Sequence, residues 1–397
     1  MSRQAWLLLG SLYTTQYMGL GFFVVALAAI LRDRGAALET VALAYMLGLV
    51  WPLKALWAPL VDRVRFGRLG HYRGWLLAMQ TTLVGLLLAI GTCDVMADFP
   101  LVYALCLAVA VASATQDIAV DGLACSLLAP AERGLGNGLQ IAGGLVGNLL
   151  GGGVVLMAYP LIGWAGAMAV LAGGTSVSLI QLLMFREPER SARTASTLLA
   201  FARFLTFWRM PGAGRLILLL LLFPMGSAMA YAVITPALVD AGWPLARIGL
   251  VVNVAGSLAG LGAAMATGWW LGRIGRRTAL IAGALVQAAG VLAVLLVVCD
   301  GGTILAGLGV LLFFLGYNPA STILATLMMD WAAQDSPATD YTLQFSITQI
   351  AGMGTMTAAA SVAGMTGYGG VVGLAVAASL AAAAVALGYR APGPSVR

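Results

Sequence analysis

The sequence predicts an all-α membrane protein whose helices cross the bilayer repeatedly and fall into two similar halves. Of its 397 residues, 61% are hydrophobic and 9% are charged, and the mean hydropathy is +0.96. A soluble domain is about half apolar and about a quarter charged, and it could not bury this much apolar surface. The composition therefore excludes a water-soluble enzyme, a nucleic-acid-binding protein and a secreted disulfide scaffold.

Twelve apolar runs are long enough to be membrane spans, since a helix needs roughly 20 apolar residues to cross the hydrocarbon core. The expected spans are residues 5–31, 39–60, 74–93, 100–127, 136–158, 164–185, 215–239, 247–271, 278–299, 303–330, 342–365 and 370–389. A connection rich in arginine, serine and threonine separates the sixth and seventh spans. We therefore expect an N-terminal six-helix bundle (1–185), a cytoplasmic linker (186–214) and a C-terminal six-helix bundle (215–397).

The arginines predict the orientation of these spans. Seventeen of them lie in one set of alternate loops and the two tails, whereas Arg32, Arg34 and Arg247 alone lie in the opposite set. Loops rich in arginine and lysine stay in the cytoplasm. Both termini are therefore expected there, and the net charge of +6 reflects topology rather than a nucleic-acid partner.

A fixed offset relates the two halves. Asp33 falls on Asp240 at an offset of 207 (240 − 33), and the same offset puts Gly163 on Gly370. We expect this offset to hold without gaps from the first span of each half to its sixth. Parallel repeats of this kind form two pseudo-symmetric bundles about an axis along the membrane normal, with a central site at their interface.

The loops after the second and eighth spans, 58–68 and 272–277, are rich in arginine, and the first of them also carries Asp62. They resemble the cytoplasmic loop of the major facilitator superfamily, which implies a twelve-helix transporter fold. An acidic residue there can cap a helix N-terminus, while the arginines bind carboxylates or lipid phosphates and close the cytoplasmic side. Alternatively, the arginines serve only as topology signals. The gating residues expected from this resemblance are Asp62, Arg63, Arg68, Arg273 and Arg276.

Three charged residues stand out deeper inside the expected spans, where a charge costs on the order of 3 kcal/mol or more without a partner or an aqueous cavity. Lys54, the chain's lone lysine, precedes Asp62 by eight residues, which puts it roughly 12 Å inside the cytoplasmic edge. Asp117 and Asp121 are one turn apart on one helix face. Together they suit a proton carrier with Lys54 as counter-ion. The alternatives are a snorkelling Lys54, a purely structural ion pair at Asp117 and a hydrated helix end at Asp121.

Two stretches carry a closer resemblance. Both resemble motifs of the AmpG-type muropeptide permeases. The first comprises residues 53–63 with Arg73-Gly74-Trp75, and the second comprises residues 114–121 with Glu132-Arg133-Gly134 and Asn137. Residues 12–23, followed by Ile30-Leu31-Arg32, resemble the RhtX/FptX siderophore permeases within that group. This resemblance implies import of an intact metal–siderophore complex across the bacterial inner membrane with protons, and marks Lys54, Gln116, Asp117 and Asp121 as functional positions. Muropeptide permeases usually have extra C-terminal spans, which favours the siderophore branch.

Polar and aromatic groups at membrane depth are candidates for substrate binding, because spans 1, 4, 7 and 10 line the cavity in the resembled fold. Buried amides also bond neighbouring helices, which is their alternative role. The candidates are Gln16, Tyr17, Gln116, Tyr231, Tyr317 and Asn318.

No cofactor or metal site is expected, because His71 is the single histidine and the four cysteines lack CxxC spacing. The prediction is a non-enzymatic, proton-coupled importer of a pyochelin-like ferric siderophore by alternating access, with the substrate complex, protons and the lipid bilayer as its partners. An AmpG-like permease for muropeptides or another amphiphilic metabolite is the alternative. A membrane sensor that binds a ligand without moving it is the second alternative.

Overall fold

The structure is a computed structural model that describes residues 1–66, 69–188, 197–299 and 302–391, and within these ranges it contains helices and no strand. Its helical elements are α1 (Arg3–Gly21), η1 (Phe22–Leu27), α2 (Ala28–Asp33), α3 (Leu38–Met46), η2 (Leu47–Leu49), α4 (Val50–Leu53), η3 (Lys54–Trp57), α5 (Ala58–Arg63), α6 (Tyr72–Gly91), α7 (Phe99–Leu127), α8 (Arg133–Asn148), η5 (Leu149–Val154), α9 (Val155–Met184), α10 (Thr197–Thr206), η6 (Phe207–Arg209), α11 (Ala213–Asp240), α12 (Leu245–Ile248), η7 (Gly249–Ala255), α13 (Gly256–Trp270), α14 (Arg276–Leu292), α15 (Leu295–Val298), α16 (Gly302–Trp331) and α17 (Pro337–Leu387).

Ten helical segments of the described chain are long and apolar enough to cross a membrane. The chain is therefore a multi-pass membrane protein. The segments are Arg3–Asp33, Leu38–Arg63, Tyr72–Gly91, Phe99–Leu127, Arg133–Met184, Ala213–Asp240, Leu245–Trp270, Arg276–Val298, Gly302–Trp331 and Pro337–Leu387. Their ends fall within a few residues of the expected spans, because the apolar runs themselves set where a helix can be buried in lipid.

Two of these segments are much longer than the others, with 52 and 51 residues, and each is interrupted by a glycine. Gly163 has φ 63° and Gly367 has φ 69°, so both lie in the left-handed region that interrupts an α-helix and favours glycine. Each break falls between two of the spans expected from the sequence.

The two breaks also correct the expected register. They lie 204 residues apart (367 − 163), so Gly163 corresponds to Gly367, and its pairing with Gly370 is wrong. The starts of α6 and α14 are also 204 apart (276 − 72), whereas those of α3 and α12 are 207 apart (245 − 38). The offset changes because the connection 64–71 is three residues longer than the connection 271–275.

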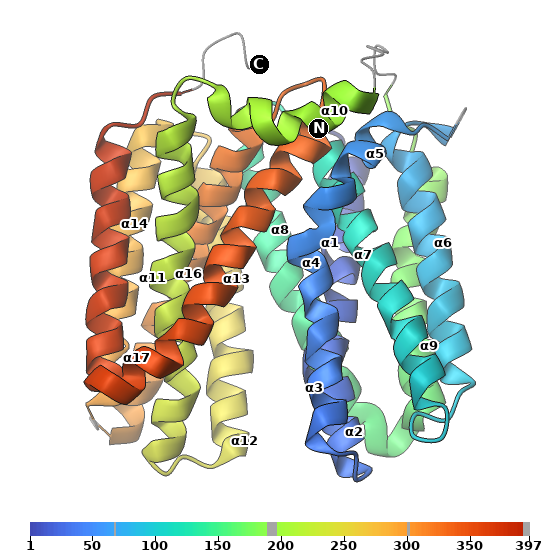
Figure 1. Cartoon of the computed structure of the whole chain (residues 1–397), viewed down its shortest axis with the longest axis horizontal. Coiled ribbons are helices and arrows are strands. Elements are labelled where there is room, and N and C mark those ends of the chain that lie inside the picture. The colour runs from blue at the N-terminus through green and yellow to red at the C-terminus, as the bar shows by residue number, and fades with distance from the viewer. Residues whose placement is uncertain (67–68, 189–196, 300–301, 392–397) are drawn as a thin grey trace. The chain divides into compact units, whose positions relative to one another are not determined.

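One compact unit comprises Met1–Leu127, Gly143–Arg203 and Gln334–Leu343. Inside it, α6 packs along both α7 and α9, and α1 packs against α7 and the π-helical turn η5 (Figure 1). Its core is apolar and includes the buried side chains of Phe22 and Met168. This unit holds the charged residues that the sequence places inside the membrane.

Glycines allow the backbone of α1 to touch the backbones of η5 and of the end of α8 in this unit. A Cβ atom on Gly151 would overlap the carbonyl oxygen of Met18, and one on Gly147 would overlap that of Thr14. Small residues permit such close approach of helices in a membrane. The glycine-rich stretch therefore positions α1, which carries several polar side chains into the unit.

The second compact unit comprises Leu128–Ala142, Phe204–Ala333 and Gln344–Arg397. Here α16 packs against α14, α13 and α11, and the core includes the buried residues Val310 and Phe313 (Figure 1). Three of the unit boundaries fall inside α8, α10 and α17, and the other two fall at the end of α7 and between α16 and α17.

Candidate functional site

A buried charge cluster forms in the first unit from residues of two spans. The Lys54 ammonium group donates to the carboxylate of Asp117 and lies 3.8 Å from Oδ2 of Asp121. All three side chains are at most 1% exposed. Lys54 therefore does not snorkel to the surface, and Asp121 is not a hydrated residue at a helix end.

Local backbone geometry places Lys54. The segment from Leu38 to Arg63 alternates between α-helical and 3₁₀ turns, and Lys54 is the first residue of the 3₁₀ turn η3. Pro52 lacks an N–H group and stands just before this turn, and mid-helix 3₁₀ stretches frequently mark hinges. The irregular turn directs the ammonium group toward α7, where Asp117 and Asp121 share one face.

A polar shell from α1 completes the cluster. The Gln16 amide donates to Asp117 Oδ1 over 2.8 Å, and the Tyr13 hydroxyl donates to Asp121 Oδ1 over 3.4 Å. Gln116 is fully buried, and its amide donates to the carbonyl of Leu12 over 3.3 Å. The predicted residues Gln16 and Gln116 thus lie beside the charges. Tyr13 was not predicted, although its position three residues before Gln16 puts both on one face of a helix.

The charge balance of this cluster defines its chemistry. One ammonium and two carboxylates carry a formal charge of −1, and ionised groups out of water are costly unless fully paired. Uptake of one proton by a carboxyl neutralises the cluster and weakens the hold on Lys54. The arrangement can therefore exchange a proton, or an anionic group of a ligand, against the existing ion pairs.

The amide oxygens of Gln16, Gln80 and Gln116 are buried and accept no hydrogen bond from the described residues. Unpaired acceptors in a protein interior are usually satisfied by ordered water or a ligand. They lie on three different helices, α1, α6 and α7. Of the three, Gln16 contacts the charge cluster directly, through its hydrogen bond to Asp117.

A second network in the same unit contains the expected gating residue Asp62. Its carboxylate accepts from Thr339 N–H over 2.7 Å, from the Thr339 hydroxyl over 2.6 Å and from Ala338 N–H over 3.3 Å. The Tyr72 hydroxyl also donates to it. Asp62 therefore caps the first turn of α17, where a negative charge is favoured. Arg63 is half-buried in this region, and Arg68 lies outside the described residues.

The basic residues of the other expected loop behave differently from one another. Arg276 Nε donates to Asp330 Oδ2 over 2.5 Å, and Arg133 Nη1 donates to Asp330 Oδ1 over 2.9 Å. The guanidinium of Arg273 instead stacks on the Trp269 ring, 3.5 Å from its centroid. Asp330 and Arg133 were not among the predicted gating residues, because nothing in the sequence pairs the ends of α8 and α16.

The predicted binding tyrosines of the second unit join an aromatic cluster. Phe313 stacks between Tyr231 and Tyr317, with ring centroids 6.2 Å and 5.7 Å apart, and Phe314 meets Tyr231 edge-on. Tyr231 remains 39% exposed.

Two predicted binding residues have other surroundings. The Asn318 amide is buried and donates to the carbonyl of Phe314 on its own helix, over 2.9 Å. Tyr17 is half-buried in the first unit, where its ring lies against Gly144 of α8. No group of three or more histidine, cysteine or acidic side chains that could hold a metal ion occurs in the described part of the chain.

Comparison with known proteins places the chain in a family. The profile of the Major Facilitator Superfamily matches residues 9–356. This match covers most of the sequence, and the structure is all-helical with repeated apolar spans. The chain therefore belongs to the Major Facilitator Superfamily, a family of membrane transporters.

The relatives lie in the muropeptide-permease branch. The chain is 30% identical to the anhydromuropeptide permease of Escherichia coli K12 over 256 residues, which is 64% of this chain and 52% of the permease. It is 24% identical to the putative transporter AmpG 4 of Rickettsia felis over 263 residues, 63% of this chain and 64% of that protein. The match thus spans about half the length of the permease. The similarity to AmpG-like permeases expected from the motifs is confirmed.

The fold resembles that of solved transporters. The crystal structure of the human organic anion transporter MFSD10 aligns with a TM-score of 0.76 at 15% identity, covering 97% of this chain and all of that one. At this identity the likeness concerns the fold alone.

Proposed function

We propose that this protein is a proton-coupled secondary transporter of the bacterial inner membrane that works by alternating access. Its twelve crossings would form two six-helix bundles with both termini in the cytoplasm. A continuous helix of 52 residues would measure roughly 78 Å, against roughly 30 Å of hydrocarbon. In this proposal, the breaks at Gly163 and Gly367 would divide each long segment into two crossings, so that the ten segments would make twelve.

The observation that carries this proposal is the buried cluster of Lys54, Asp117 and Asp121. In the proposed cycle, Lys54 holds the ionised carboxylates when no proton is bound. Protonation of one carboxyl releases the ammonium group, which then attracts an anionic group of the substrate. Substrate and proton are thereby coupled through one cation, and Gln16 keeps Asp117 oriented in both states.

The proposed gate rests on Asp62. Its hydrogen bonds fix the start of α17, and Arg203 clamps Asp340 in the same turn through two hydrogen bonds. Because α17 begins here, release of these contacts would free the helix to move. Asp330, which joins Arg133 and Arg276, would serve the same purpose in the second unit.

The substrate that the relatives favour is a muropeptide or a similar amphiphilic organic anion. The similarity to the anhydromuropeptide permease supports this class. A cation at the coupling site suits the carboxylates of a peptide stem, and the exposed ring of Tyr231 suits stacking on a sugar or an apolar group.

A ferric siderophore of the pyochelin type is the second candidate. The relatives described above do not support it, but the cluster of Tyr231, Phe313 and Tyr317 does, because stacked rings fit an aromatic chelator. The iron would travel inside its chelator as cargo.

Uptake into proteoliposomes distinguishes these substrates. Purified full-length protein would be tested with labelled anhydromuropeptide and with radioactive iron chelated by pyochelin, each with and without an inward proton gradient. Gradient-dependent accumulation of one compound identifies it as substrate. Binding of either compound without counterflow would contradict transport and favour a sensor.

A further inference from the structure

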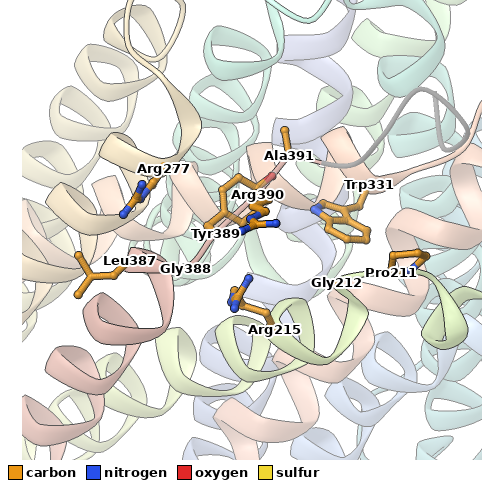
Figure 2. A pocket seen from close by; sticks show the side chains of 10 residues that line it. All are labelled: Pro211, Gly212, Arg215, Arg277, Trp331, Leu387, Gly388, Tyr389, Arg390 and Ala391. Atoms are coloured by element: carbon orange, nitrogen blue, oxygen red, sulfur yellow. The ribbon is translucent and has the colours of Figure 1, made fainter.

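A cavity at one end of the second unit lies apart from the coupling cluster. It has a volume of ≈ 780 Å³ and forms where α11 and α14 begin and where α16 and α17 end (Figure 2). Three arginines and two aromatic residues stand out among the side chains around it. They are Arg215, Arg277, Arg390, Trp331 and Tyr389.

The three arginines have no acidic partner in the described part of the chain. No aspartate or glutamate is among the described residues that line the cavity, and no described carboxylate pairs with Arg215, Arg277 or Arg390. The neighbouring Arg276, by contrast, is paired with Asp330. Three like charges around one space raise the local potential and attract an anion.

A buried donor independently points to a ligand. Trp331 is only 2% exposed, and its indole Nε1–H finds no acceptor in the described part of the structure. An indole nitrogen can only donate, so a buried one requires an acceptor. Figure 2 shows this nitrogen on the side of the ring that faces Arg390. A hydrogen-bond acceptor in the cavity could bind both the indole N–H of Trp331 and the guanidinium of Arg390.

Two glycines shape the wall of the cavity, Gly388 beside the Arg215 guanidinium and Gly212 at the start of α11. A Cβ atom on Gly388 would lie 2.8 Å from Nη2 of Arg215, so the absence of a side chain there leaves room for this guanidinium against the end of α17. Gly212, with φ 91°, precedes the first turn of α11 and offers no side-chain cap, and the N–H groups of Ala213 and Arg215 donate to the carbonyl groups of Met210 and Gly212. The positive end of the helix dipole adds to the arginine charges.

We propose that this cavity binds a phosphate-bearing anion, supplied either by a lipid headgroup or by a phosphate compound in the aqueous phase. Guanidinium groups bind phosphate oxygens through paired hydrogen bonds, and Trp331 would donate one more. The site takes no part in the proposed proton cycle, because none of its residues belongs to the cluster around Lys54.

Two probes test the site on the full-length protein in neutral detergent. Native mass spectrometry would measure retained phosphatidylglycerol, with diacylglycerol as the lipid without phosphate, and equilibrium dialysis would measure binding of radioactive pyrophosphate. Retention of phosphatidylglycerol alone supports a lipid headgroup, and binding of pyrophosphate supports an aqueous source. The double variant Arg215→Gln/Arg390→Gln should lose at least about tenfold in affinity for whichever probe binds.

The controls keep the test falsifiable. Arg65→Gln removes another exposed arginine that has no ion pair among the described residues and should leave binding unchanged. Trp331→Phe keeps the aromatic ring and removes the donor, and should weaken binding several-fold even if the double variant does not fold. The proposal is overturned if neither probe binds the wild type, if the folded double variant binds normally, or if Arg65→Gln loses as much as the double variant.

Discussion

Lys54 and Asp117 form an ion pair that is fully enclosed by the first unit, with Asp121 3.8 Å from the same ammonium group. Burying such an ion pair in a membrane protein costs free energy, and apolar residues of equal size would stabilise the fold at least as well. The pair therefore points to a functional role. Its position beside Gln16 and Tyr13 gives it a defined geometry.

Lys54→Met is expected to destabilise the protein by about 3–5 kcal/mol, because it leaves two buried carboxylates without their cation. The double variant Lys54→Met/Asp117→Asn should regain a large part of that loss, since only one carboxylate remains. Thermal unfolding in detergent measures both. Equal melting temperatures for the single variant and the wild type would contradict a cluster held by this ion pair.

Asp62→Ala is expected to release the first turn of α17. Amide hydrogen exchange should quicken at Ala338 and Thr339, whose N–H groups donate to Asp62, with a loss of about 1 kcal/mol of local stability. Tyr72→Phe is the matched control, because it removes a different donor from the same carboxylate. Unchanged exchange at both amides in Asp62→Ala would show that the cap does not hold this turn.

Gly151→Ala should cost about 1–3 kcal/mol, because the added methyl group overlaps the backbone of α1 at Met18. Gly173→Ala in α9 is the control, since nothing lies within 4 Å of its added Cβ. Removing a glycine from a helix there should be neutral or stabilising by up to about 1 kcal/mol. Comparable melting temperatures for the two variants would contradict the close packing of α1 and η5.

Tyr231→Ala should raise the KM for transport about three- to tenfold, because one stacking face of the aromatic cluster is lost. Tyr231→Phe retains the ring and should transport normally. Tyr45→Ala, at another exposed tyrosine, controls for general loss of surface aromatic area. If KM is the same for all three variants, Tyr231 does not contact the substrate.

Much of the fold follows from hydropathy alone. The spans end within a few residues of the apolar runs, because an unpaired backbone or a charge is costly in lipid. The same cost identified Lys54, Asp117 and Asp121 as partners, since three isolated charges inside a membrane would each be unfavourable. Helical spacing then put both carboxylates on one face.

Contacts between distant segments were not predictable in the same way. The capping of α17 by Asp62 joins residues 277 positions apart, and the Arg203–Asp340 pair joins residues 137 apart. No local pattern encodes such a pairing. The predicted offset of 207 residues between the two halves was also wrong beyond the second span. The two halves differ by three residues in the length of one loop, and the periodicity of apolar residues does not reveal such a difference.

The most direct test of the coupling proposal compares accumulation and counterflow for Asp117→Asn in proteoliposomes, using the substrate identified by uptake. The amide cannot carry a proton, but it can still accept a hydrogen bond from Gln16. We predict that the variant exchanges labelled for unlabelled substrate across the membrane, yet no longer accumulates it when an inward proton gradient is imposed. Gradient-driven accumulation at the wild-type level in Asp117→Asn would contradict the proposal that this carboxylate couples transport to protons.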